Sequence, residues 1–104
     1  MASLDNLTVT TATDDSTLVI AEGQIDSHTS SLLDEALTAV AGDVPLSVNL
    51  AGITFVDSSG LRVIVGAHKR QLSGGGSLTI VKPSVPVARL LDITGLTPEL
   101  QIVP

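Results

Sequence analysis

Four residues that could support chemistry stand side by side in the chain: Asp57, Ser58, Ser59 and Gly60. They separate an apolar segment from one whose apolar residues recur at helical spacing, so we expect them at a helix N-terminus. Short polar side chains cap such a terminus, and one cap needs only one of them. At least one hydroxyl is therefore left free. Because the unpaired amides and the helix dipole favour an anion, that hydroxyl is well placed to carry phosphate.

A purely structural interpretation of this junction is also open. Asp57 or Ser58 caps the helix, and Gly60 allows a close approach of the backbone to its neighbours. Both interpretations predict a helix that begins at Ser58. They differ in whether a hydroxyl serves a partner.

Nucleophilic catalysis by Ser58 is disfavoured by the residues around it. A nucleophile elbow has the pattern Gly-x-Ser-x-Gly, and here Val56 stands at the first position. His68 lies roughly 15 Å of helical rise from Ser58, too far to act as its base. His28 has no evident orienting acid or oxyanion hole, and Asp26-x-His28 lacks a third metal ligand. We expect His28 on the surface, His68 half-buried on a helix flank, and no metal.

Hydrophobic periodicity predicts the elements that must position these residues. In chain order, it predicts two strands in residues 7–23 around a polar turn at 13–16, a helix capped by Asp26 or Ser27 that ends at Gly42, a strand at 46–50, a helix from Ser58 to about Leu72, a strand at 77–81, a helix capped by Ser84, and an edge strand within 99–103.

This order predicts a single α/β domain over residues 1–104. We expect a mixed sheet of about five strands, in which an N-terminal antiparallel hairpin precedes parallel β-α-β units. The helices should lie mainly on one face, because the strands are half polar. Loops at the carboxyl ends of parallel strands meet at one edge. The loop at 23–27 should therefore bring Asp26 and His28 near Ser58 and form a composite site.

Composition narrows the possible partners. The net charge is −6, and only five residues are Lys or Arg, of which Arg62, Lys69 and Arg70 lie in one predicted helix. Three basic residues do not make the broad basic face that nucleic acids need, and an acidic surface disfavours anionic membranes. The charge therefore favours a protein partner with a basic patch.

Residue usage also bears on the compartment. The chain contains no cysteine, which excludes disulfides and thiolate metal sites. No apolar run approaches the ~20 residues that cross a bilayer, and the first residues lack the basic region and apolar core of a signal peptide. We expect a cytoplasmic protein.

Segments distributed from residue 23 to residue 96 resemble the bacterial anti-sigma factor antagonists of the STAS domain family. The family's strand-to-phosphosite stretch is similar to LSVNLAGITFVDSSGL at 46–61. The family signature is similar to FVDSSGLRVIVGAHKR at 55–70. Its Gly-Glu-Leu-Asp segment after the second strand is similar to GQID at 23–26. Its C-terminal helix is similar to VARLLDITGL at 87–96.

The resemblance assigns roles to particular positions. It places the family's phosphorylated serine at Ser58 and its two aspartates at Asp57 and Asp26. It implies a partner-binding surface around this serine, made of Asp26, Asp57, Ser59, Gly60, Leu61 and Arg62. Two positions depart from the family pattern. Gln24 stands where many members have glutamate, which removes one acid, and Arg62 stands where some have glycine, which makes the partner-facing turn bulkier and more basic.

The resemblance implies a protein-interaction switch. The unphosphorylated protein would bind an anti-sigma factor that is also a serine kinase, and the sigma factor would be released. Phosphorylation of Ser58 by that partner would end the binding, and a serine phosphatase would reset it. The chain would then be a substrate and not an enzyme, without a cofactor, since the partner binds the ATP. The alternative is a STAS module that regulates a transporter or sensory complex through the same surface without phosphotransfer.

Overall fold

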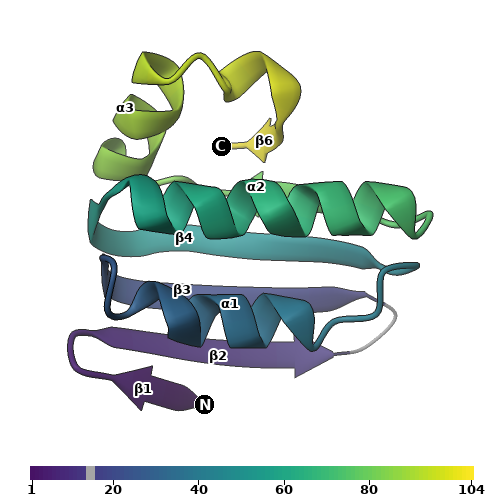
Figure 1. The fold of residues 1–104 in the computed structure, drawn as a ribbon, viewed down its shortest axis with the longest axis horizontal. Helices are drawn as coiled ribbons and strands as arrows, with labels where there is room; N and C mark the ends of the chain where they lie inside the picture. Colours follow the sequence, from purple (N-terminus) through teal and green to yellow (C-terminus); the bar gives the residue numbers. More distant parts are fainter. Residues whose placement is uncertain (14–15) are drawn as a thin grey trace.

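The computed structural model describes residues 1–13 and 16–104. In this part of the chain, a six-stranded mixed sheet in the order β1-β2-β3-β4-β5-β6 forms one layer of the fold (Figure 1). The pairs β1–β2 and β2–β3 are antiparallel, and β3 to β6 run parallel to one another. The strands are β1 (Ala2–Leu4), β2 (Leu7–Thr13), β3 (Thr17–Ile25), β4 (Pro45–Val56), β5 (Ser77–Val81) and β6 (Gln101–Val103).

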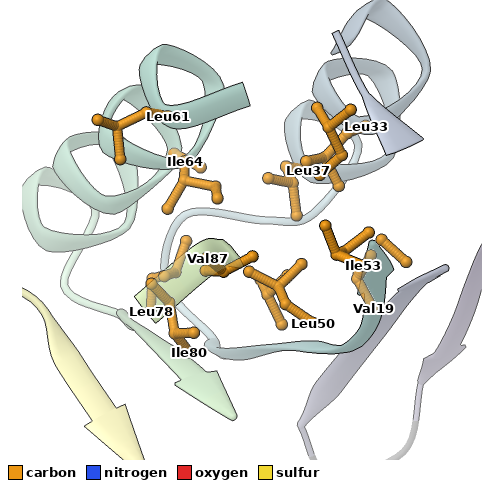
Figure 2. Close-up of a cluster of buried hydrophobic side chains, with 14 of the residues drawn as sticks. Val19, Leu33, Leu37, Leu50, Ile53, Leu61, Ile64, Leu78, Ile80 and Val87 are labelled. Carbon is orange, nitrogen blue, oxygen red and sulfur yellow. The ribbon is translucent and has the colours of Figure 1, made fainter. Parts of the chain in front are cut away.

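Three helices pack on one face of this sheet and enclose the core. They are α1 (Ser30–Thr38), α2 (Ser58–Ser73) and α3 (Val85–Ile93), and a short 3-10 helix, η1 (Thr97–Glu99), leads into β6. Figure 2 shows their apolar side chains converging on those of the strands, Leu37 from α1, Ile64 from α2 and Val87 from α3 among them. No helix in the described part of the chain is long and apolar enough to cross a membrane.

The pattern along β4 explains why the helices lie on one side. Leu46, Val48 and Leu50 are buried beneath the helices, whereas Ser47 and Asn49, which point to the other face, are half-buried. A strand that buries alternate residues needs a helix layer on one side only. The predicted fold class, a mixed sheet with helices on one face, is confirmed.

Two strands differ from the prediction. β1 is too short to show a period and adds a sixth strand to the expected five or so. β4 continues to Val56, well beyond its predicted end. Its pairing with β3 shifts register twice, between Ile20 and Glu22 and between Gly23 and Gln24. Such irregularities break the alternation by which a strand is recognised in a sequence.

Helix α1 begins later and ends earlier than predicted. It starts at Ser30 with Thr29 as its N-cap, because a hydrogen-bonded turn over residues 26–29 precedes it. The cap predicted at Asp26 or Ser27 is therefore misplaced: Asp26 accepts amide hydrogen bonds in that turn instead of at the helix. It stops at Thr38 instead of reaching Gly42.

A buried side chain of α2 accounts for the early end of α1. The amide of Gln71, which is 1% exposed, donates hydrogen bonds to the carbonyls of Ala41 at 3.0 Å and Val44 at 2.9 Å. A buried amide needs such partners. This one takes them from the segment after α1, which therefore leaves the helical path.

The other elements lie where the periodicity predicts. β5 occupies 77–81, α2 begins at Ser58, and α3 follows Ser84, whose side chain makes no capping hydrogen bond. The predicted turn at 13–16 includes residues 14 and 15, which lie outside the described residues.

The first turn of α2 lies close to the sheet because residue 60 is glycine. A Cβ atom at Gly60 would stand 2.6 Å from Cγ2 of Ile25 and 2.9 Å from Cγ2 of Val56. Both methyl groups belong to stiff β-branched side chains, and Ile25 is fully buried, so neither can move aside easily. The close-approach interpretation of Gly60 is therefore confirmed.

We predict that Gly60→Ala lowers the free energy of unfolding by about 1–3 kcal/mol, the usual cost of overpacking. The matched control is Gly66→Ala in the same helix, where a Cβ would meet only Nη1 of Arg70 at 3.9 Å. The control should gain up to about 1 kcal/mol from helix propensity. Urea denaturation followed by circular dichroism measures both, and equal stabilisation of the two variants would contradict the packing role of Gly60.

Candidate functional site

Asp57 is the N-cap of α2. Its backbone is extended, with φ −115°, and its Oδ1 accepts a hydrogen bond from the Ser59 amide at 2.8 Å. Its own amide donates to the Ile25 carbonyl at 3.1 Å, which ties the end of β4 to the end of β3. Of the two residues that the sequence offers as caps, Asp57 performs this role and Ser58 does not.

Ser58 is the first residue of α2, and its side chain is exposed. Its hydroxyl has no hydrogen-bond partner within residues 1–13 and 16–104. Ser59 is half-buried, and the cap already uses its amide. Ser58 therefore presents a free hydroxyl at the positive end of the helix dipole, a location that stabilises an attached anion.

The turn after β3 is built around Asp26. Its Oδ1 accepts hydrogen bonds from the amides of His28 and Thr29, both at 2.9 Å. The Thr29 hydroxyl donates to the Gln24 carbonyl at 2.8 Å and accepts from the Asp26 amide at 2.9 Å. The hydrogen bonds that the Asp26 carboxylate accepts within residues 1–13 and 16–104 all go to Oδ1, so Oδ2 is available to a partner.

The sequence analysis missed Thr29. It is 2% exposed and acts by holding Asp26 in place. The signal was the spacing Asp-x-x-Thr, in which two short polar side chains bond reciprocally to each other's amides, as in a capping box.

Asp26 and Asp57 lie side by side because they follow paired residues of neighbouring strands. Ile25 pairs with Val56 in the parallel register of β3 and β4, and such strands lie about 4.8 Å apart. The carboxyl edge of the sheet therefore brings Asp26, Asp57 and Ser58 together, as the composite site requires.

Within residues 1–13 and 16–104, neither histidine ring forms a hydrogen bond with Asp26, Asp57 or Ser58. Nε2 of His28 lies 2.7 Å from Oδ2 of Asp5, and the two side chains are 65% and 62% exposed. His68 is half-buried in α2. The predictions of a surface and a half-buried histidine are confirmed. In the described part of the chain, no three His, Asp or Glu side chains are grouped so that they could hold a metal ion.

The remaining candidates occupy the first turns of α2. Gly60 is buried and Leu61 is 9% exposed, so both serve mainly the packing of the helix. Arg62 is exposed and lies one turn after Ser58 on the same side of the helix. Among the candidate residues, the exposed or half-buried polar side chains are thus those of Asp26, Asp57, Ser58, Ser59 and Arg62.

The family is now identifiable, since residues 8–104 match the STAS domain model. The chain belongs to the STAS domain family. It is 37% identical over 94 residues to an anti-sigma-B factor antagonist of Staphylococcus epidermidis, with 88% of this chain and 87% of the relative covered. A crystal structure of an anti-sigma factor antagonist from Mycobacterium paratuberculosis has the same fold, with a TM-score of 0.85 at 23% identity over 100% of this chain and 91% of that chain. The structure of Bacillus SpoIIAA in its phosphorylated form matches with a TM-score of 0.69 at 18% identity, over 94% and 91%.

In this STAS domain, local hydrogen bonds keep Asp26 charged. The Thr29 amide has the largest effect and lowers the pKa of the Asp26 carboxyl from its ordinary 3.8, against an opposing contribution from partial burial. The amide and the ring of His28 and the hydroxyl of Thr29 lower it further. Asp26 therefore carries a negative charge beside Ser58 at neutral pH.

We predict that the stability advantage of the wild-type STAS domain over Asp26→Asn depends on pH. A carboxyl whose pKa is lowered by folding stabilises the fold above its unfolded pKa, and this contribution is lost as the pH falls through the folded pKa. The advantage should be constant near neutral pH and shrink below about 3.8. Urea unfolding of both proteins at a series of pH values measures it. An advantage that grows on acidification would contradict the role of the charged carboxylate.

Proposed function

We propose that this protein is an anti-sigma factor antagonist controlled by phosphorylation of Ser58. The proposal rests on the exposed hydroxyl of Ser58 at the start of α2, which has no hydrogen-bond partner in the described part of the chain and stands beside a cap that Asp57 already provides. In the unphosphorylated state, the protein binds an anti-sigma factor that is also a serine kinase, and the sigma factor is released. Phosphorylation of Ser58 ends this binding, and a serine phosphatase restores it.

The chemistry assigns the catalytic work to the partner. The bond between the γ-phosphorus of ATP and its bridging oxygen breaks, a bond to Oγ of Ser58 forms, and the serine proton passes to a base of the kinase. Because the partner holds the ATP, this chain is the substrate and has no cofactor of its own. The reaction takes place in the cytoplasm. The names of the relatives support the role of antagonist, and the phosphorylated form of SpoIIAA supports control by phosphorylation.

Phosphate should disturb the interface more than the fold. Within the domain, the helix N-terminus stabilises the exposed anion by ~0.3–1 kcal/mol, and the charges of Asp57 and Asp26 oppose it through solvent by a comparable amount. At the interface, a dianion against a surface shaped for a neutral hydroxyl loses hydration without a compensating partner, which typically costs several kcal/mol. The domain therefore keeps its fold while the complex separates.

We predict that Ser58→Ala abolishes phosphorylation by the anti-sigma factor kinase and leaves the affinity for that kinase within a few-fold of wild type. The matched control, Ser59→Ala, should still accept one phosphate. Adjacent helical residues are turned about 100° apart, so one hydroxyl at most faces the kinase. Incubation with the kinase and ATP followed by mass spectrometry of peptides locates the phosphate. Phosphate on Ser59 would refute the site, and no phosphate at all would favour a STAS module that acts without phosphotransfer.

We predict that phosphorylated protein binds the kinase ~100-fold or more weakly than unmodified protein, a loss of about 2.7 kcal/mol. Ser58→Asp should reproduce only part of this loss, because one carboxylate has less charge and fewer acceptor oxygens than a phosphate. Calorimetry measures the affinities, and amide spectra of the free proteins report on the fold. Widespread shifts in those spectra, or undiminished binding, would contradict a switch that acts at the interface.

A further inference from the structure

A groove of about 430 Å³ runs along the outer side of α2, and Ser58 stands at one end of it. Its apolar lining comes from Leu61 and Val65 of α2 and from Leu96, which lies after α3. The lining residues of α2 recur at the spacing of a helical stripe that borders the buried stripe through Ile64 and Ala67, and Leu61 belongs to both. The groove thus begins at the candidate site and continues along the helix.

The wall opposite α2 is firmly held. Helix α3 ends in a turn where Gly95 has φ +75°, and the Leu96 amide donates to the Leu91 carbonyl at 3.0 Å. This is the Schellman arrangement, which fixes the residue after the glycine. Leu96 is therefore a fixed, half-buried wall of the groove.

Gly66 lines the groove in the middle of α2, where the fold gains nothing from glycine. A Cβ there would meet only the far end of the Arg70 side chain at 3.9 Å. Elsewhere the packing does require glycine: a Cβ at Gly60 would lie 2.6 Å from Ile25, and one at Gly74 would lie 2.4 Å from the Gly42 carbonyl oxygen. Glycine in a helix interior costs about 1 kcal/mol relative to alanine. At residue 66 no packing contact compensates this cost, and the missing side chain leaves open space in the groove, outside the domain's own core.

The charges beside the groove are free to bind a ligand. Arg62 and Lys69 line it, and Arg70 lies next to it over Gly66. All three are exposed, and none forms an ion pair with another residue of ranges 1–13 and 16–104. They are three of the five Lys and Arg residues in a chain of net charge −6. An apolar groove with exposed cations along it is complementary to an apolar side chain flanked by carboxylates.

We propose that this groove receives an apolar side chain from an acidic segment of the anti-sigma factor, with Arg62 and Lys69 pairing its flanking carboxylates. The inference rests on the proposed function and names the chemistry of the partner. It also gives phosphorylation a second effect. Ser58 and Arg62 are one helical turn apart, so a phosphate on Ser58 can pair with Arg62 and repel the incoming carboxylates.

The test uses purified anti-sigma factor kinases from the organism that encodes this chain. Calorimetry measures the affinity of wild type and of each variant for these kinases. Lys69→Glu should weaken binding roughly tenfold or more. Arg89→Glu makes the same change of net charge at an exposed position of α3, and its affinity should stay within about twofold of wild type. Gly66→Leu should also weaken binding roughly tenfold or more by filling the groove. Unfolding curves check that the variants fold, and Gly66→Leu should be no less stable than wild type, because leucine favours a helix more than glycine does.

The outcomes separate this inference from the function beneath it. If wild type binds a kinase and Ser58→Asp weakens that binding, but the two groove variants bind like wild type, the groove is not the docking site and the proposed function stands. Tighter binding by Lys69→Glu would show a basic partner segment and overturn the inference. If wild type binds none of the kinases, both the function and the groove assignment fail.

Discussion

The contact between the first turn of α2 and the ends of β3 and β4 governs the rest of the site. With no side chain at residue 60, the helix approaches until the methyl groups of Ile25 and Val56 fill the space that a Cβ would need. At that distance the Asp57 amide reaches the Ile25 carbonyl. This hydrogen bond sets the point and direction at which the helix leaves the sheet. The hydroxyl of Ser58 is exposed at the edge of the sheet because of this geometry, and a bulkier residue 60 would displace both the core and the candidate site.

The acids around Ser58 have structural duties that make the hydroxyl available. Asp57 satisfies a first-turn amide of α2, so Ser58 need not fold back to do so. Asp26 satisfies two amides of the turn before α1 and is held by the buried Thr29. Each carboxylate is thereby fixed at the same edge of the sheet as Ser58, so the negative charge there is preorganised. The structural and functional interpretations of this motif are therefore complementary. Because Asp57 provides the cap, the Ser58 hydroxyl remains free for the proposed phosphorylation.

Local pattern sufficed where an element depends on its own residues. β5 and α2 each follow one unbroken period, and the junction at Asp57 and Ser58 has a recognisable cap. The pattern failed where distant contacts decide. The end of α1 depends on the amide of Gln71, 30 residues beyond its partner Ala41, and the second half of β4 follows register shifts that rotate its side chains. Likewise, topology alone predicts that Asp26 lies near Ser58. The roles of Thr29 and of Leu96 in the groove wall depend on side-chain geometry, which hydrophobic periodicity does not predict.

The position of Ser58 also divides the surface by charge. The fixed carboxylates of Asp26 and Asp57 lie on the sheet side of the hydroxyl, and the exposed cations of Arg62 and Lys69 begin one turn along the helix. A phosphate adds roughly two negative charges at this boundary. It extends the acidic edge and neutralises the near end of the basic stripe, so the potential that steers an acidic partner segment weakens as well. One modification at the start of a helix can therefore act on both the approach of a partner and the complex that it forms, without any change in the packing that Gly60 sustains.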